Sequence, residues 1–286
     1  MTVLEVIQRS TEFLAQKGVE PARLQAELLL ADALKVQRMQ LYLNFERMLT
    51  PAELQPYREL VRRRAQREPL QHIVGSTSFC GLEISVNRNA LVPRPETELL
   101  AEHGWKFMNE RAATEESVTA LDFGTGTGCL AIALASKCPR ARIHALDIST
   151  AAIELARQNA TRHNFVDRIQ FWCGDGFSAL PKELRFDLLI SNPPYIPSAE
   201  IEGLDREVRD FDPRIALDGG KDGLGFYRLL ASQGAAFLNP GGKSLVEMGD
   251  GQSGSVREIF EKQNWVVEAV HCDYNQCPRI LIAHRV

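Results

Sequence analysis

The sequence predicts an α/β protein: a doubly wound, mostly parallel sheet that follows a small helical domain. From about residue 94 onward, helical and strand patterns alternate, which is typical of such a sheet. Residues 1–72 instead carry apolar residues at helical spacing. The length of 286 residues suits one large and one small domain. Hydrophobic residues make up 44% and charged residues 24%, a balance that supports a buried core and argues against disorder.

The first 72 residues are expected to form three or four helices. Apolar residues recur at helical spacing over residues 3–14 and again over 24–34. Thr50-Pro51-Ala52-Glu53 has the signals of a helix start: an N-cap threonine, a first-turn proline and a capping-box glutamate. We expect this last helix to run to about Glu68.

Four arginines cluster near the end of that helix, at Arg62, Arg63, Arg64 and Arg67. They fit a contact surface for RNA or for an acidic partner. Cations in a last helical turn also suit the helix dipole, and we favour this second interpretation, with the arginines on a solvated face.

Residues 73–93 change period and predict a short β-hairpin that links the two domains. Apolar residues from Ile73 to Val92 are separated by Gly75, Gly81 and the polar stretch 87–89. We therefore divide the chain into a helical domain at 1–72, a hairpin linker at 73–93 and an α/β domain at 94–286.

Within the α/β domain the elements are expected in alternating order. Helices are predicted near residues 97–111, 128–137, 151–163, 225–238 and 254–263, and strands near 120–123, 142–147, 169–173, 186–191, 244–247, 265–272 and 279–285.

A glycine-rich turn leaves the first strand of this domain and enters a helix through Gly124, Thr125, Gly126, Thr127 and Gly128. Glycine permits a tight turn and a close approach of a ligand to the backbone. The dinucleotide fingerprint G-x-G-x-x-G would need a glycine at position 129, where this chain has a cysteine. Taken alone, the turn fits a nucleotide-like ligand and a structural turn equally well.

Two aspartates extend this pattern. Asp147 lies 19 residues after Gly128 at the end of the next strand, where a carboxylate can accept hydrogen bonds from ribose hydroxyls; it could also belong to the following helix start. Asp175, with Gly176, ends the strand after that and could accept a hydrogen bond from an adenine amino group, or form a surface turn. The carboxyl ends of such strands are where open α/β sheets bind ligands.

The segment Asn192-Pro193-Pro194-Tyr195 directly follows a buried-strand pattern. Prolines have no N–H and fix the backbone, so the Asn192 side-chain oxygen and the Pro193 carbonyl can both accept from one NH₂ group. An amide or aromatic amine is a poor nucleophile because its lone pair is delocalised, and holding both hydrogens orients the nitrogen toward an electrophilic methyl group. Tyr195 is expected to form a wall of the pocket, and the alternative is a structural proline turn.

This combination resembles class I S-adenosylmethionine-dependent methyltransferases that act on amide or exocyclic nitrogens. Nearly the whole chain is similar to the release factor glutamine methyltransferase family, in Ala26–Leu30, Glu68–Gly75, Leu91–Glu98, Asp122–Gly128, Ser191–Ile196, Asp212–Leu217 and Gly219–Leu224. The stretch Arg94-Pro95-Glu96-Thr97-Glu98 discriminates this family best. The resemblance implies a Rossmann-like class I methyltransferase fold with S-adenosylmethionine as cofactor. It also implies methylation of the glutamine amide in the Gly-Gly-Gln loop of peptide chain release factors.

The resemblance further implies which residues act. Gly124–Gly128, Asp147 and Asn192 would contact S-adenosylmethionine, Asn192–Tyr195 would hold the glutamine amide, and the helical domain would help to dock the release factor. Arg94, Glu96 and Glu98 would shape the pocket, or serve only as balancing charges at a helix start.

Two departures from the family pattern stand out. Directly after Asp175 many relatives carry an aromatic residue or alanine, whereas this chain has Gly176 followed by Phe177, so the residue that packs near the adenine stays open. Residues 274–278 are also unusual, and we expect a surface-loop change there.

Other functions share parts of this pattern. A glutamine methyltransferase of a ribosomal protein would have the same glycine turn and Asn192–Tyr195 loop. A nucleic-acid methyltransferase acting on the adenine amine should need a basic groove or a base-flipping domain, whereas the net charge here is -4. Cys129 argues against a nicotinamide-dependent dehydrogenase, and a non-catalytic adaptor would be expected to have lost Asn192 or the glycines.

The six cysteines are scattered, without a C-x-x-C pair or zinc-ligand spacing, which predicts reduced thiols and no metal site. Glu5 interrupts the first apolar stretch, so no signal peptide is indicated, and no apolar run reaches the length of a membrane span. We expect a cytoplasmic monomer without direct nucleic-acid or membrane contact.

Overall fold

The computed structural model describes residues 1–285, which form two compact units. One unit comprises Met1–Ser76 together with Asp205–Phe211, and the other comprises Thr77–Leu204 with residues 212–285. The segment Asp205–Phe211 therefore belongs to the helical unit although it lies far along the chain, which no local pattern in the sequence suggested.

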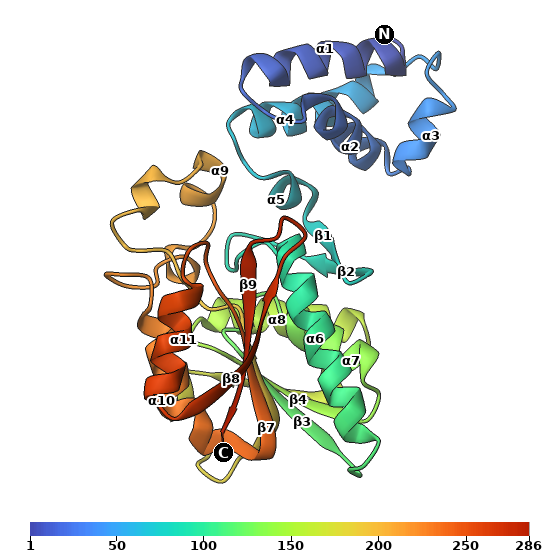
Figure 1. The fold of residues 1–286 in the computed structure, drawn as a ribbon. Coiled ribbons are helices and arrows are strands. Elements are labelled where there is room, and N and C mark those ends of the chain that lie inside the picture. The colour runs from blue at the N-terminus through green and yellow to red at the C-terminus, as the bar shows by residue number, and fades with distance from the viewer. Residues whose placement is uncertain (286) are drawn as a thin grey trace. The chain divides into compact units, whose positions relative to one another are not determined.

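The helical unit consists of α1 (Val3–Gln16), α2 (Ala22–Leu34), α3 (Arg38–Tyr42), α4 (Pro51–Ala65), α5 (Leu70–Val74) and α9 (Arg206–Arg209) (Figure 1). The start of α4 confirms the sequence prediction: the Thr50 side chain accepts from the Glu53 amide, and the Glu53 side chain accepts from the Thr50 amide. The apolar faces of α1, α2 and α4 meet in a core around Leu14, Leu30 and Tyr57.

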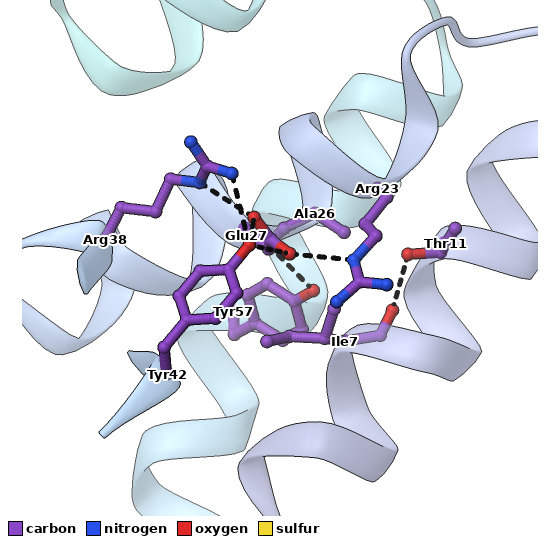
Figure 2. Close-up of polar contacts among 8 residues, drawn as sticks. All are labelled: Ile7, Thr11, Arg23, Ala26, Glu27, Arg38, Tyr42 and Tyr57. Atoms are coloured by element: carbon purple, nitrogen blue, oxygen red, sulfur yellow. Dashed lines mark hydrogen bonds and ion pairs between the residues drawn. The ribbon is translucent and has the colours of Figure 1, made fainter. Parts of the chain in front are cut away.

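A carboxylate is buried inside this unit, at Glu27 of α2, whose side chain is 1% exposed (Figure 2). Its oxygens accept hydrogen bonds from Arg23 at 3.0 Å, from Arg38 at 2.7 Å and from the Tyr42 hydroxyl at 2.8 Å. Burial alone would raise the pKa of Glu27, but these donors outweigh it and lower the pKa below its usual range. Glu27 is therefore ionised and joins α2 to α3.

The arginines at the end of α4 bond mainly within the helical unit. The Arg64 side chain is 1% exposed and donates to Gln25, to the Glu68 carbonyl at 2.9 Å and to Glu207 at 2.7 Å. Arg67 also pairs with Glu207, at 2.8 Å. The other two pair nearby, Arg62 with Glu59 and Arg63 with Glu68. The expectation of a solvated face is wrong for Arg64. A buried guanidinium needs acceptors, and two of those at Arg64, Gln25 and Glu207, come from distant segments of the chain.

The predicted hairpin is found at β1 (Ser76–Phe79) and β2 (Leu82–Ser85), which form a two-stranded sheet. Cys80 and Gly81 make the turn, with φ of 51° and 78°. The prediction is wrong at Ile73 and Val74, which lie in α5. That helix follows Pro69 and ends at Gly75, whose φ of 85° allows the left-handed helix cap, so the same apolar residues face a helical core instead of a strand partner.

The second unit is built on a seven-stranded sheet in the order β5 (Ile169–Cys173), β4 (Ala141–Asp147), β3 (Val118–Phe123), β6 (Phe186–Ser191), β7 (Leu238–Glu247), β9 (Pro278–Arg285) and β8 (Trp265–Cys272). The first five strands are parallel, and β9 runs antiparallel to both β7 and β8. The chain reverses its direction of winding between β3 and β6. This topology confirms the predicted doubly wound α/β fold.

Helices cover both faces of the sheet: α6 (Pro95–Ala112), α7 (Cys129–Lys137) and α8 (Thr150–Arg162) pack on one face, and α10 (Gly225–Gln233) and α11 (Ser253–Lys262) on the other (Figure 1). Short 3₁₀ turns lie at Val166–Arg168, Gly176–Ala179, Ile201–Gly203, Arg214–Ala216 and Gly234–Phe237. Neighbouring residues alternate between the two cores, as Ala120 and Leu121 do, which explains the continuous apolar runs of the central strands. Within residues 1–285, no helix is both long and apolar enough to cross a membrane.

Candidate active site

The site lies where the winding of the sheet reverses. β3 and β6 are hydrogen-bonded neighbours, with Asp122 opposite Ile190. The glycine turn leaves the carboxyl end of β3 and the Asn192–Tyr195 loop leaves the carboxyl end of β6, so two motifs almost 70 residues apart begin side by side. Open α/β sheets bind their ligands in this position.

A pocket opens between these two motifs, and most of the residues predicted for the site line it. They are Gly124, Thr125, Gly126, Thr127, Asp147, Asp175, Gly176, Asn192 and Pro194. Gly128, Pro193 and Tyr195 do not line it in this structure. Pro193 is buried, and Tyr195 packs partly into the core beneath α10 and α11.

The glycines of the turn serve different purposes. All three have positive φ, of 76° at Gly124, 53° at Gly126 and 80° at Gly128. A Cβ on Gly124 would meet nothing within 4 Å, so the backbone there is open to a ligand. A Cβ on Gly128 would lie 2.9 Å from the Cβ of Ala156 in α8. Gly128 is therefore required by helix packing, and Gly124 leaves room in the pocket.

Asp147 both shapes the turn and lines the pocket. One of its oxygens accepts from the Gly126 amide at 2.9 Å, and the other accepts from the Ser149 amide at 2.9 Å. Burial raises the pKa of Asp147 although these amide bonds oppose the change. The carboxylate therefore holds Ser149, the N-cap residue of α8, and also lines the pocket, so the geometry is compatible with both sequence interpretations of Asp147.

A second carboxyl group, Asp122, supports the turn from below and was not singled out from the sequence. It is fully buried, and one oxygen accepts from the Thr125 hydroxyl at 2.6 Å and from the Ala131 amide at 3.1 Å. Its other oxygen has no hydrogen-bond partner among the described residues. Burial raises the pKa of Asp122 to about 7. An acidic residue near the end of a strand, two positions before the first glycine of the turn, was the available signal.

The structure shows where Phe177 lies relative to the pocket near Asp175. The ring of Phe177 is buried in the core, with its centroid 4.9 Å from that of Phe123 and 5.0 Å from that of Phe237. It therefore does not line the pocket. Asp175 is exposed, and the apolar side chains of Ile148 and Leu229 line the same pocket.

The Asn192–Tyr195 loop is held at both ends by side chains from other elements. The Asn192 amide nitrogen donates to the Thr97 hydroxyl at 3.0 Å, and that hydroxyl donates to Glu247 at 2.7 Å. At the other end, the Tyr195 carbonyl accepts from the Gln252 amide at 2.9 Å. Thr97 lies in the first turn of α6 and Glu247 ends β7, so the Asn192–Tyr195 loop is tied to two elements far from it in the sequence.

The glycine-rich segment at 219–224 supports the same loop. A Cβ on Gly219 would lie 2.8 Å from the Cα of Tyr195, and a Cβ on Gly223 would collide with the Tyr195 carbonyl. The Ile196 amide donates to the Leu217 carbonyl at 3.0 Å. The two glycines are needed because the backbone of this segment packs directly on the loop.

The residues of the Arg94–Glu98 stretch make contacts in different parts of the structure. Arg94 lines the pocket and pairs at 2.7 Å with Asp212, whose side chain is 1% exposed. Thr97 lines the pocket as well. Glu98 instead accepts from the Cys80 amide at 2.8 Å and so supports the hairpin turn. Sequence reasoning assigned Thr97 no role of its own and did not consider Glu247.

Comparison with known proteins identifies the family of this chain. A model of the PrmC N-terminal domain matches residues 5–75, and one of the methyltransferase small domain matches residues 99–203. The release factor glutamine methyltransferase of Geobacter sulfurreducens is 46% identical over 261 residues, which cover 91% of this chain and 89% of that one. The corresponding protein of Chlorobaculum tepidum is 40% identical over 282 residues, covering 97% and 95%. The chain belongs to the release factor glutamine methyltransferase family.

Solved structures agree with the fold of this family. A methyltransferase from Pyrococcus furiosus superposes with a TM-score of 0.50 at 22% identity, covering 71% of this chain and 88% of that one. The catalytic domain of hMettl16, solved in complex with MAT2A 3′UTR hairpin 6, superposes with a TM-score of 0.53 at 17% identity, covering 78% and 81%. At these identities the likeness establishes the methyltransferase fold, which confirms the predicted fold class.

Proposed function

We propose that this protein transfers a methyl group from S-adenosylmethionine to the side-chain amide nitrogen of the glutamine in the Gly-Gly-Gln motif of peptide chain release factors. Besides membership of this family, one observation in the structure supports the proposal. Asn192 lines the same pocket as the glycine turn, and its amide nitrogen is engaged by Thr97. The amide oxygen is thereby left for a substrate.

The pocket fits S-adenosylmethionine, which supplies an electrophilic methyl group when it is bound. The open side of Gly124 admits a ligand against the backbone. Asp147 lines the pocket where ribose hydroxyls would be accepted, and Asp175 lines it where an adenine amino group would be accepted. Ile148 and Leu229 add apolar side chains for the faces of the base.

The loop after β6 supplies what a glutamine amide needs. We propose that the Asn192 side-chain oxygen, which faces the pocket, and the Pro193 carbonyl, which lies outside the pocket lining in this structure, accept the two N–H hydrogens of the substrate. This holds the nitrogen in one orientation and favours a localised lone pair, which is catalysis by positioning and electrostatics. No strong base is required, because the nitrogen can lose a proton after it has become cationic. Tyr195 would complete the enclosure of the amide.

We propose that the helical domain predicted at residues 1–72 docks the release factor. Its support is the match to the PrmC N-terminal domain and the exposure of large apolar side chains between residues 39 and 48. Met39, Leu43 and Met48 are 68%, 81% and 65% exposed, and exposed apolar surface is typical of protein–protein interaction sites.

The remaining expectations follow from this assignment. A protein substrate suits the net charge of -4, and we propose a cytoplasmic monomer that makes no direct contact with nucleic acid. A glutamine of a ribosomal protein would be held by the same two acceptors, so the loop alone does not distinguish the two protein targets.

The test is mass spectrometry of an unmodified release factor after incubation with the protein and S-adenosylmethionine. We expect the Gly-Gly-Gln peptide to gain the mass of one methylene group. The gain should vanish with Asn192→Ala and persist with Asn109→Ala, a matched change on the exposed side of α6. Modification of a ribosomal protein or of a nucleic acid, with the release factor unchanged, would contradict the proposal.

A further inference from the structure

We propose that Thr97 and Glu247 are positioning residues that decide which way the Asn192 amide faces, through the direction of a single hydroxyl proton. This inference rests on the proposed function, because it concerns how the substrate amide is held.

The three side chains form a buried chain of hydrogen bonds from three elements. Asn192 follows β6, Thr97 lies in the first turn of α6 and Glu247 ends β7. The distances are 3.0 Å from the Asn192 nitrogen to the Thr97 hydroxyl and 2.7 Å from that hydroxyl to Glu247. Thr97 and Glu247 are 3% and 2% exposed, so solvent does not compete for these bonds.

The chemistry of the groups gives the chain a direction. An ionised carboxylate can only accept, and a threonine hydroxyl has one proton. With Glu247 ionised, the Thr97 proton must point to Glu247, and the Thr97 oxygen can then only accept from Asn192. The amide nitrogen of Asn192 therefore faces Thr97, and its oxygen faces the pocket that Asn192 lines.

The opposite orientation would abolish the grip on the substrate. The two ends of an asparagine amide have nearly the same shape, so packing alone does not select one of them. A reversed Asn192 would present an NH₂ group to the NH₂ group of the incoming glutamine, and two donors do not bond. The Pro193 carbonyl cannot reverse in this way, so Asn192 is the acceptor whose orientation must be set.

The same logic couples the orientation to pH. Burial raises the pKa of Glu247 to about 7. A protonated Glu247 can donate to Thr97, which frees the threonine proton for the Asn192 oxygen and permits the reversed amide. The charged and titratable groups around Glu247 are Arg94, Glu96, Tyr195, Tyr227 and Arg279. Both tyrosines have raised pKa values and stay neutral, so among these neighbouring groups Glu247 is the one that changes near pH 7.

The first test is steady-state methylation of a release factor by four variants. Thr97→Val keeps the shape and removes the hydroxyl, and kcat should fall about 10–100-fold while KM for the release factor changes less than about 3-fold. Thr97→Ser keeps the hydroxyl and should stay within about 3-fold of wild type. Glu247→Gln should lower kcat about 10-fold and abolish the loss of rate that wild type shows as pH falls through about 7. Thr161→Val, at an exposed threonine of α8, is the matched control.

The second test needs no release factor. In protein labelled with ¹⁵N-asparagine, the side-chain NH₂ signal of Asn192 is identified by its absence in Asn192→Ala. It should shift with pH with a midpoint near 7 in wild type, and should not titrate in Glu247→Gln. If the wild-type enzyme leaves release factors unmodified, the proposed function is wrong. The titration of the Asn192 signal still tests the inference in that case, because it needs no substrate. A fully active Thr97→Val enzyme, or an Asn192 signal that titrates alike in both proteins, would overturn it.

Discussion

Glu27 in the helical unit and Glu247 in the α/β unit are buried to almost the same extent, with 1% and 2% of each residue exposed. Their pKa values nevertheless move in opposite directions. Burial works against both charges, but at Glu27 the bonds from Arg23, Arg38 and Tyr42 outweigh it and lower the pKa. At Glu247 burial dominates and raises the pKa to about 7, because the hydrogen bond from the Thr97 hydroxyl and the more distant charges of Arg279 and Arg94 compensate for it only in part.

The difference shows that burial alone does not determine the role of a carboxyl group. Charged donors fix Glu27 in one ionisation state, which suits a residue that joins helices. A single neutral donor leaves Glu247 close to its titration point, and strongly shifted groups of this kind concentrate at functional sites. We therefore assign Glu27 to stability and, in line with the proposal above, Glu247 to the orientation of the Asn192 amide.

The largest effect is expected at Asn192, where the network of Glu247 ends. Asn192→Ala should lower kcat by about 10²–10³-fold, as when a single group that stabilises a transition state is removed. The free energy of unfolding should change by less than about 1 kcal/mol, because the side chain is half-buried and carries no charge. Single-turnover methylation and urea unfolding measure the two effects, and a large loss of stability would contradict the assignment.

Glu247→Gln should stabilise the protein at alkaline pH while it slows catalysis. The folded-state pKa of about 7 lies above the usual 4.5, so the folded state binds the proton more tightly and stability falls as pH rises between these values. Removing the ionisable group should add up to about 3 kcal/mol at about pH 8 and almost nothing at about pH 4. Thermal unfolding across this range checks the sign, and a destabilised variant at alkaline pH would break the comparison.

Glu27→Gln should have the opposite effect. A lowered folded-state pKa gives stability that is present above the usual value and is lost as pH falls through the folded one. The variant should lose about 1–3 kcal/mol at neutral pH, the range for hydrogen bonds to charged groups, and approach wild type in acid. Urea unfolding at neutral and acidic pH measures this, and a gap that widens in acid would contradict the assignment.

The smallest effect is expected at Glu268, an exposed glutamate that serves as a control for both. It pairs with Lys243 at 2.7 Å, but its side chain is 44% exposed. Solvent screens such pairs, so Glu268→Gln should change the free energy of unfolding by less than about 1 kcal/mol, and less still at high salt. An effect as large as that at Glu27 would show that burial is not what separates Glu268 from the two buried glutamates.

Much of the fold could be predicted from the sequence because the patterns involved are local. The strands at 169–173, 186–191 and 265–272 begin and end where their apolar runs predict. The strand expected at 244–247 begins earlier, at Leu238, because its first residues pair with β6 despite a proline and two glycines that locally indicate a turn. Ile73 and Val74 join a helix because a helical core, distant in sequence, receives them.

The candidate site also has parts that the sequence predicts and parts that it does not. The glycine turn, Asp147, Asp175 and Asn192 could be placed in one pocket in advance, since parallel strands bring their carboxyl ends to a common edge. The positions of Pro193 and Tyr195 outside the lining could not, because they depend on how the 219–224 segment packs on the loop.

The sequence by itself determined the order of the elements, the glycine turn and the chemistry of the Asn192 loop, because periodicity, backbone freedom and side-chain type are properties of short segments. Tertiary structure alone decided that Thr97 and Glu247, 150 residues apart, share a hydrogen bond. It also decided that two glutamates titrate in opposite directions. Both outcomes depend on which groups surround a side chain after burial, and the surrounding groups come from distant parts of the chain.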